Sequence, residues 1–547
     1  MEESMLIELA VCFAIFVCFC VSKIVYSVYL KPKRLEKLLR QQGIKGTSYK
    51  LVQGDNLVMQ EMANEALSKP ISLNHKIAPR VNPFIDHMVK KYGLYMSLDP
   101  SFLFTSVANL LFVYNSSNGI LGVLQRNMCF SWSGTRPRLI IAEAELMKMI
   151  LNDKNGHIQK LPQNPLVDLL TKGVLTFEGQ KWGKRRRLIN PAFHHQKLLG
   201  MVPEFIASCR KRMDHWKRLV AASDEGTEID VSSELRNLSA DVIAKTAFGS
   251  SYEEGQKIFE LQQEQAFLIN EAFNSLYFPG LRFIPTKKNR RRYEVDKEIK
   301  NMLREIINKK QRAILDGESS GDTDLLGLLL QCKEEKGNDM TIDDVIEECK
   351  LFYFAGHETT ANWLTWTLFC LALHPEWQEK ARQEVHQICG DKTPDADVLN
   401  QLKIVTMVLN EVLRLYPPVI NLWRFTAGRT RIGNMSVPAG VELNLPTVLL
   451  HHSSEYWGDD AQEFKPERFA EGVSKATIKD QATAFYPFGW GSRICIGQNF
   501  AVIEAKLALS MILQNFSFKL SPSYVHAPHS VITLQPQHGA PLIFQSV

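Results

Sequence analysis

The segment "PFGWGSRICIG", residues 487–497, narrows what this chain can fold into more than any other, because it sets one cysteine in an unusual backbone environment. Cys495 lies among three glycines and close to Arg493, directly ahead of a helical pattern that begins near Gln498. Glycines let a chain approach a flat cofactor closely, and a cation with a helix N-terminus favours the thiolate. The segment therefore predicts a metal-ligating thiolate. The alternative is a buried, inert cysteine.

Other readings of the cysteines find little support. The ten cysteines of the 547-residue chain are scattered and form no Cys-x-x-Cys pair, which excludes a disulfide framework and disfavours a structural zinc site. The loop is not a phosphate-binding glycine loop, because a Gly-x-Gly-x-x-Gly run from Gly489 would need glycine at Ile494. The net charge of +5 gives no support for nucleic-acid binding.

The N-terminus predicts a membrane anchor. The stretch from Leu9 to Leu30 is apolar, contains one charge at Lys23, and has about the length of a bilayer-spanning helix. Acidic residues precede it and basic residues follow it, so the positive-inside rule places the rest of the chain in the cytosol. The alternative is a buried core helix. We expect an anchor at 1–30, a basic linker at 31–50 and a globular domain at 51–547.

The remaining patterns indicate a mainly α protein with small β-sheets. Helical periodicity dominates from Leu166 to about Leu415. Short β-prone runs follow at residues 430–446 and 530–544. One long helix is expected ahead of Pro375, because Thr341 and Asp344 have capping-box spacing at its start.

The centre of that long helix reads "AGHETT", an unusual choice for a helix interior. Gly356 and two successive threonines weaken a helix and predict a local opening. A zinc-protease motif is excluded, because Ala361 stands where its second histidine would fall. A buried Glu358 beside the hydroxyl of Thr359 would suit proton delivery. The alternative is a kinked packing helix with a hydrogen-bonded glutamate.

Two later motifs carry charges that could form one buried network. Glu411 and Arg414 stand three residues apart on a helix that must end before Pro417. Arg468 follows in "EFKPERF" and offers a second guanidinium group. The spacing alone does not bring the three side chains together.

In this order, the motifs resemble the cytochrome P450 superfamily of haem-thiolate monooxygenases. The pattern Phe-x-x-Gly-x-Arg-x-Cys-x-Gly is complete, and it is preceded by Trp-x-x-x-Arg, Ala-Gly-His-Glu-Thr-Thr, Glu-x-x-Arg and Pro-Glu-Arg-Phe. Segments such as "LTFEGQKWGKRRRLINPAFH" resemble sequences of the plant 72 clan, family 72A. The resemblance covers the chain from about residue 45 onward. It implies the cytochrome P450 fold behind one N-terminal transmembrane helix.

The resemblance implies a role for each matching residue. Cys495 would be the axial thiolate of haem b, and Glu358 and Thr359 would deliver protons during oxygen activation. The haem would contact Trp182, Arg186, Ala355, Gly356, Arg424, Phe488, Arg493 and Gly497. A structural triad would comprise Glu411, Arg414 and Arg468. By analogy, substrate would contact Leu351, Phe352, Val419, Ile420, Leu422, Val531 and Ile532.

The implied function is insertion of one oxygen atom from O2 into a hydrophobic small molecule, and a terpenoid or terpenoid-derived hormone is expected. The sequence contains no flavin or nicotinamide fingerprint, so the electrons would come from NADPH through an external cytochrome P450 reductase. Candidate docking cations are Lys181, Lys184, Arg185 and Arg187, or these form a plain solvated charge run. The expected location is the endoplasmic reticulum membrane, single-pass, with the catalytic domain facing the cytosol. The alternatives are a non-hydroxylating haem-thiolate enzyme, which cleaves or rearranges its substrate, and a catalytically silent binding protein.

The sequence departs from the family pattern in two places. The proline-rich hinge of many relatives is replaced by "QQGIKGTSY", which leaves the orientation of the domain on the membrane less defined. An atypical apolar insertion is expected at about 94–129, either as a membrane-dipping segment or as a translated retained intron. We favour the retained intron, because the segment has neither helical nor strand periodicity.

Overall fold

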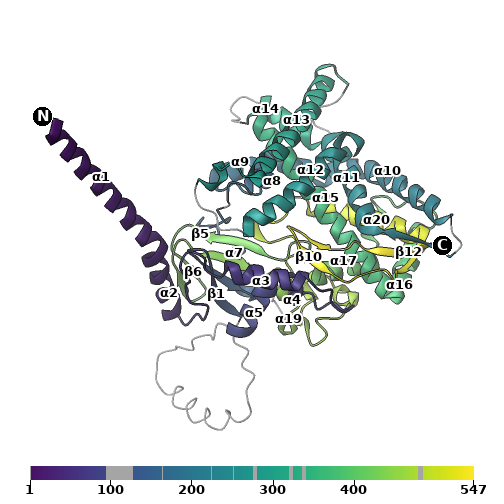
Figure 1. Ribbon diagram of the computed structural model, residues 1–547. Helices are drawn as coiled ribbons and strands as arrows, with labels where there is room; N and C mark the ends of the chain where they lie inside the picture. The colour runs from purple at the N-terminus through teal and green to yellow at the C-terminus, as the bar shows by residue number, and fades with distance from the viewer. Residues whose placement is uncertain are drawn as a thin grey trace, which may run out of the picture.

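The computed structural model describes residues 2–93, 127–162, 164–222, 225–250, 252–274, 280–318, 324–334, 340–478 and 484–547. Helices dominate and the sheets are small, as predicted (Figure 1). The N-terminal helical segments are α1 (Glu2–Val25), the π-helical turn η1 (Tyr26–Leu30), α2 (Lys31–Gln41), α3 (Asn56–Leu67), α4 (Ala78–Val81) and α5 (Pro83–Tyr92).

Helix α1 extends away from the body of the protein in Figure 1. Among the described residues, Met5–Gln41 is the one helical stretch long and apolar enough to cross a membrane, and its apolar part is not buried. This finding is consistent with a single-pass membrane anchor.

The helices of the body pack around one large apolar core and two smaller apolar clusters. They are α7 (Ala144–Leu151), α8 (Asp168–Thr171), α9 (Gly179–Ile189), α10 (His195–Val220), α11 (Val231–Phe248), α12 (Tyr252–Asn274), α13 (Lys287–Leu315), α14 (Leu325–Glu334), α15 (Ile342–Leu373), α16 (Pro375–Cys389) and α17 (Lys403–Leu415). Later helices are α18 (Thr447–His451), α19 (Ser454–Trp457) and α20 (Gln498–Asn515).

The largest sheet has five strands in the order β1 (Met128–Ser133), β2 (Arg136–Ile141), β8 (Glu442–Leu445), β5 (Leu422–Thr426) and β3 (Ile158–Gln159). Strands β2 and β8 are parallel, and the other neighbours are antiparallel. A second sheet has the order β4 (Thr227–Asp230), β12 (Pro541–Ser546) and β9 (Phe516–Leu520). Two hairpins pair β6 (Thr430–Ile432) with β7 (Met435–Val437), and β10 (Pro528–Ser530) with β11 (Leu534–Pro536).

Most of the expected insertion at 94–129 lies outside the described residues. Its last two residues, Met128 and Cys129, belong to β1, where they are buried and pair with Ile141 and Ile140. These two residues are therefore part of the sheet.

Helix α15 begins and ends as predicted. Asp344 N–H donates to the Thr341 hydroxyl at 3.1 Å, and the Asp344 carboxylate accepts from Thr341 N–H at 3.1 Å, which completes a capping box. The helix ends at Leu373, just ahead of Pro375, so its 32 residues span about 48 Å.

The predicted local opening of this helix at Gly356 is wrong, because α15 runs without a break from Ile342 to Leu373. The physical reason for the glycine is helix packing. A Cβ added at Gly356 would lie 2.7 Å from the side chain of Ile243 on α11. Glycine therefore lets α11 pack closely against α15.

Candidate active site

The loop around Cys495 is closed by its own backbone. Cys495 N–H donates to the carbonyl of Phe488 at 2.9 Å. Gly489 and Gly491 have φ values of +73° and +72°, in the left-handed region that favours glycine. A Cβ added at Gly491 would overlap the carbonyl of Leu151. These constraints position Cys495 ahead of α20, which begins at Gln498 as predicted.

Cys495 is an exposed residue, although nearby protein atoms desolvate its thiol. Burial therefore raises its pKa, while a hydrogen bond from the backbone of Gly497 and the charge of Arg186 act in the opposite direction. The N–H group and the cation both stabilise negative charge on the sulfur. This environment suits a thiolate once a positive ligand partner compensates the desolvation.

The cations predicted to contact a cofactor do gather around the cysteine loop. The guanidinium group of Arg493 lies over the ring of Trp182 at 4.0 Å and donates to the carbonyl of Phe177 at 2.8 Å. Arg186, on the same helix α9 as Trp182, donates to the carbonyl of Ile494 at 3.0 Å. Contacts of Arg493 and Ile494, on the N-terminal side of Cys495, therefore hold the cysteine loop against α9 and Phe177.

Arg424 and Lys160 add two more positive charges. Burial and the nearby Arg493 lower the pKa of Arg424, a buried residue of β5, to about 10. Burial, Arg424 and Arg493 lower the pKa of Lys160 to about 7, against the attraction of Glu178. The sequence analysis did not identify Lys160, which belongs to no motif.

These four cations have little negative charge to balance them. Glu178 contacts Arg493 at 2.5 Å, and it is the only carboxylate ion-paired with Arg186, Arg424, Arg493 or Lys160 within the described parts of the chain. Like charges this close are unfavourable unless an anion joins them. The residues present therefore fit a cofactor that carries a pair of carboxylates, as haem does.

The middle of α15 faces accessible space. Ala355 is exposed although most of the residues around it on this helix are buried. Thr359 donates from its hydroxyl to the Ala355 carbonyl at 2.8 Å, one turn away. An accessible alanine in the longest central helix marks the side of α15 that a ligand can reach.

Two aromatic contacts tie α15 to the cysteine loop. Phe193 stacks on Phe352 of α15 with ring centroids 5.6 Å apart, and a Cβ added at Gly497 would lie 3.9 Å from Phe193. Phe488 packs edge-on against Trp363 of α15 at 6.0 Å. The loop and the helix therefore belong to one site.

Glu358 does not hydrogen-bond to Thr359 in the described structure. Its carboxylate accepts from the Thr533 hydroxyl at 3.2 Å and from the Asn362 amide at 3.3 Å, and Asn362 also donates to Thr533 at 3.0 Å. Helical spacing could have identified Asn362, four residues after Glu358. Thr533 follows β10 and gave no sequence signal.

The ring of His357 also lies beside Glu358, with Nε2 3.5 Å from the carboxylate. Burial lowers the pKa of His357, and Glu358 opposes this shift. The other ring nitrogen lies 2.9 Å from the carbonyl of Tyr353 and must donate to it. A neutral His357 is therefore held in one tautomer.

The residues predicted to line a substrate pocket fall into two places. Half-buried Ile532 packs against an apolar cluster of Val167, Leu170, Ala266, Ile269 and Phe354. The hairpin that carries Val531 and Ile532 meets the segment of Val419, Ile420 and Leu422, because Leu534 N–H donates to Pro418 at 2.9 Å. Leu351 and Phe352 lie apart from that cluster. Leu351 faces Gly173, and Phe352 faces Phe193.

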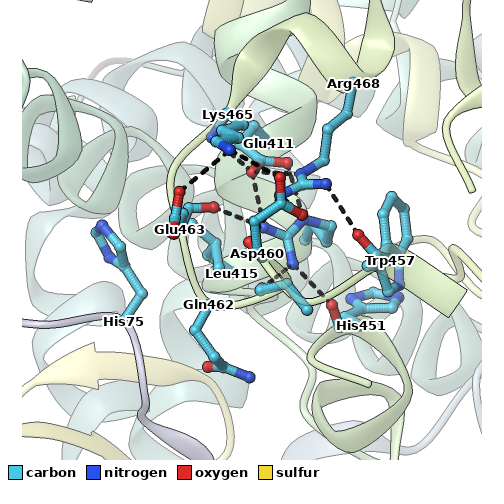
Figure 2. Close-up of polar contacts among 12 residues, drawn as sticks. His75, Glu411, Leu415, His451, Trp457, Asp460, Gln462, Glu463, Lys465 and Arg468 are labelled. Carbon is cyan, nitrogen blue, oxygen red and sulfur yellow. Dashed lines mark hydrogen bonds and ion pairs between the residues drawn. The ribbon is translucent and has the colours of Figure 1, made fainter. Parts of the chain in front are cut away.

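Glu411, Arg414 and Arg468 do come together. Figure 2 shows Glu411 beside Arg468. Arg414 donates to the two carboxylate oxygens of Glu411 at 2.8 and 2.7 Å, and both residues are fully buried. Arg468 lies 3.6 Å from the same carboxylate. The backbone N–H of Lys465 donates to Glu411 at 2.9 Å.

Carbonyl groups complete this network. Arg414 donates to the carbonyls of His451, Ala461 and Glu463 at 2.9, 2.6 and 3.0 Å. Arg468 donates to the carbonyls of Trp457 and Asp460 at 2.9 and 2.6 Å. The network fixes the segment between α18 and η6 (Pro466–Phe469) against α17. Figure 2 shows Asp460 and Lys465 of this segment beside Glu411.

One of the four candidate docking cations is not on the surface. Lys181, Lys184 and Arg187 are exposed, whereas Arg185 is buried and forms ion pairs with Asp344 at 3.2 Å and Glu348 at 3.5 Å. Helical spacing turns Arg185 toward α15, so it cannot meet a partner protein. The prediction for Arg185 is therefore wrong.

Comparison with known proteins identifies the family of the chain. The family model for Cytochrome P450 matches residues 124–539. The chain is 47% identical to Cytochrome P450 CYP72A616 of Paris polyphylla over 94% of both chains. It is 48% identical to Cytochrome P450 CYP72A219 of Panax ginseng and 47% identical to Cytochrome P450 72A15 of Arabidopsis thaliana, in each case over 95% of both chains.

Proposed function

Since this chain belongs to the cytochrome P450 family and is a monooxygenase, we propose that it hydroxylates a terpenoid or a terpenoid-derived hormone. The observation that carries this proposal is the apolar cluster around Ile532, close to the Glu358 network. Side chains of this kind exclude water and favour a hydrophobic substrate.

Cofactor binding follows from the residues already described. Cys495 would hold haem b through its sulfur, and Arg186, Arg424, Arg493 and Lys160 would bind its carboxylates. When bound, the haem supplies O2 activation and the oxidising chemistry. Phe488 packs against Trp363 and so keeps the cysteine loop fixed to α15.

Proton delivery would start at Glu358. Thr533 and Asn362 hold one of its carboxylate oxygens, which leaves the other beside His357. Thr359 is half-buried, and its hydroxyl donates to the carbonyl of exposed Ala355, one turn away. A turn of Glu358 toward Thr359 would carry a proton from the buried network to the side of α15 that carries Ala355.

Electrons would come from NADPH through a membrane-bound cytochrome P450 reductase. The exposed cations Lys181, Lys184 and Arg187 lie on α9, the helix that carries Trp182 and Arg186. A positive surface there would attract an acidic flavin domain. We further propose that the anchor lies in the endoplasmic reticulum membrane and that the catalytic domain faces the cytosol.

Two other functions compete with hydroxylation. The chain could be a haem-thiolate enzyme that cleaves or rearranges its substrate, or a protein that binds haem without turnover. The presence of Glu358 and Thr359, and the hydrogen bonds that hold Glu358, favour oxygen activation over both.

The test uses microsomes that contain the full chain and a plant reductase. A panel of triterpenes, monoterpenes and gibberellins should yield one class of hydroxylated product that depends on NADPH. Cys495→Ser should abolish both this product and the thiolate-type spectrum of the reduced, carbon-monoxide-bound protein. A normal spectrum without NADPH consumption would indicate binding only, and an unoxygenated rearranged product would indicate the other enzyme class.

A further inference from the structure

Two histidine rings meet at the end of the central helix. Nε2 of His75 lies 3.3 Å from Nε2 of His374, in the only hydrogen bond that joins two histidine side chains within the described parts of the chain. His75 lies in the loop between α3 and α4, and His374 lies at the junction of α15 and α16. The contact therefore joins an N-terminal loop to the end of α15.

The distance between the two nitrogens suits a tetrahedral metal ion. Zn–N bonds are about 2.0–2.1 Å long, so two nitrogens 3.3 Å apart correspond to an N–Zn–N angle of about 107°. Imidazole nitrogen is also one of the ligands that Zn²⁺ prefers in proteins. The pair can therefore supply two of the four ligands of such an ion.

The second nitrogen of each ring has a partner that suits metal binding. Nδ1 of His75 lies 2.9 Å from the hydroxyl oxygen of Tyr416, and Nδ1 of His374 lies 3.4 Å from the carboxylate of Glu376. Histidines that bind a metal usually donate the second ring N–H to an oxygen acceptor, which leaves the lone pair of the other nitrogen for the ion. Both rings have such an acceptor.

The loop that carries His75 is held in place. The ring of His526 donates from Nε2 to the carbonyl of Asn74 at 3.1 Å. Phe464 packs against the ring of His374 with centroids 4.8 Å apart, and against the ring of His75 at 6.3 Å. The two imidazoles are therefore positioned before an ion arrives, which reduces the entropy lost on binding.

An ion can reach the pair from solvent. The side chains of His374 and Glu376 are 28% and 56% exposed, whereas His75 is 6% exposed and closes the inner side. The described residues contain no group of three histidine, cysteine, aspartate or glutamate side chains that could hold a metal, so water would complete the coordination. Two protein ligands give a reversible site rather than a closed structural one.

The proton positions follow from these partners. Because Glu376 favours a proton on Nδ1 of His374, Nε2 of His374 accepts from Nε2–H of His75 in the metal-free protein. The hydroxyl of Tyr416 then donates to Nδ1 of His75. When an ion binds, His75 carries its proton on Nδ1 and donates it to Tyr416, so the exchange releases no net proton.

We propose that His75 and His374 bind one Zn²⁺ ion, which joins the loop before α4 to the end of α15. The site contains none of the residues that surround Cys495. It is therefore a second metal site, separate from the one proposed for haem.

The ion would stabilise a region that already holds the fold together. Tyr416 is fully buried, stacks on Trp366 of α15 with centroids 4.5 Å apart, and follows Arg414 by two residues. Figure 2 shows His75 to one side of the network around Glu411. A bound ion should therefore raise the thermal stability of the protein.

The test uses the untagged, haem-loaded full chain in lipid nanodiscs, because a polyhistidine tag would itself bind Zn²⁺. Carbethoxylation of individual histidines by diethyl pyrocarbonate is followed by peptide mass spectrometry. At a Zn²⁺ concentration ten times the Kd, His374 should react about elevenfold more slowly, and a chelator should restore its reactivity. Mg²⁺ should give no protection, because it prefers oxygen ligands. His386, a half-buried residue of α16, is the internal control and should react at one rate throughout.

Variants then separate the two ligands from the residue that orients one of them. His75→Gln removes a ligand, so the Zn²⁺ concentration that half-protects His374 should rise by at least about a hundredfold. Glu376→Ala should raise it by about tenfold, because the carboxylate orients the ring of His374. The matched control is Glu379→Ala, about one turn later on α16 and 53% exposed, which should leave it unchanged.

Equal reactivity of His374 with and without Zn²⁺ would overturn the proposal, and this comparison needs no variant that might misfold. Protection of His374 that persists unchanged in His75→Gln would also overturn it, and would indicate an adventitious ion on a single histidine. Neither result depends on the activity of the enzyme.

Discussion

Arg414 binds both carboxylate oxygens of Glu411 at the centre of a fully buried network. Glu411→Gln would remove the charge that Arg414 and Arg468 share, and would leave a guanidinium group buried without its counter-ion. We expect the free energy of unfolding to fall by about 3–5 kcal/mol. The yield of haem-loaded protein, measured from the reduced carbon-monoxide spectrum per milligram of chain, should fall sharply.

Glu463→Gln is the matched control, because Glu463 joins the same network through its backbone carbonyl and its side chain is 63% exposed. An exposed ion pair contributes about 0–1 kcal/mol, so this variant should load haem normally. Equal yields for the two variants would contradict a structural role for the Glu411 charge.

Thr533→Val removes the hydroxyl that donates to Glu358 and keeps a similar side-chain volume. We expect less product for each NADPH oxidised and a larger solvent isotope effect, because proton delivery slows. Thr359→Ala should uncouple more strongly, by about tenfold. Thr365→Val is the control, since its hydroxyl donates to Ala361 one turn away within α15. Tight coupling in both test variants would argue against a relay through Glu358 and Thr359.

Lys160→Met should weaken haem binding, because Lys160 lies beside Arg424 and Arg493 with one nearby carboxylate. We expect transfer of haem to apomyoglobin to become about tenfold faster. Its pKa of about 7 also gives a pH dependence. An added anion raises that pKa, so haem affinity should fall as pH rises above about 7 in the original chain.

The pH dependence should be weaker in Lys160→Met, while exposed Lys154→Met should leave both the transfer rate and its pH profile unchanged. A Lys160→Met variant with the original profile would place the lysine outside the cofactor site.

Glu504 on α20 provides a separate pH prediction. Its side chain is fully buried, and neither carboxylate oxygen accepts a hydrogen bond of ordinary geometry from a described residue. Burial raises the pKa of Glu504 to about 8, and the nearby Ser239 acts in the opposite direction. The folded protein therefore keeps a proton that the unfolded chain releases above about pH 4.5. Stability should decline as pH rises from about 4.5 to about 8, by a few kcal/mol in all.

Glu504→Gln should flatten this decline in thermal unfolding followed by haem absorbance, whereas Glu463→Gln should retain it. A wild-type slope in Glu504→Gln would show that another group is responsible.

Deletion of residues 94–126 should raise the yield of haem-loaded protein. A Cβ added at Gly93 would lie 3.5 Å from the Cα of Asn127, so a direct peptide bond between these residues fits the described structure. Met128 and Cys129 must remain, because they belong to β1. A variant in which a glycine-serine linker of equal length replaces the segment separates the effect of composition from that of length. An unchanged or lower yield after deletion would contradict the retained-intron interpretation.

The sequence predicted features that depend on neighbours along the chain. The capping box of Thr341 and Asp344, the end of α15 before Pro375 and the start of α20 at Gln498 follow from local rules, and the structure confirms them. Family resemblance brought together the residues around Cys495 because it carries information about distant contacts that spacing lacks.

The sequence could not predict features set by distant partners. Arg185 is buried because Asp344 and Glu348 approach it from α15, and Thr533 reaches Glu358 across the fold. Lys160 joins the cations around Cys495 although no motif contains it.

The contact between Gly356 and Ile243 restricts how this protein can diversify. A methyl group at position 356 would force the side chain of Ile243 on α11 to move, or would require a smaller residue there. A smaller residue at position 243 should therefore precede any change at position 356, so the order of the two mutations matters when directed evolution changes one codon at a time.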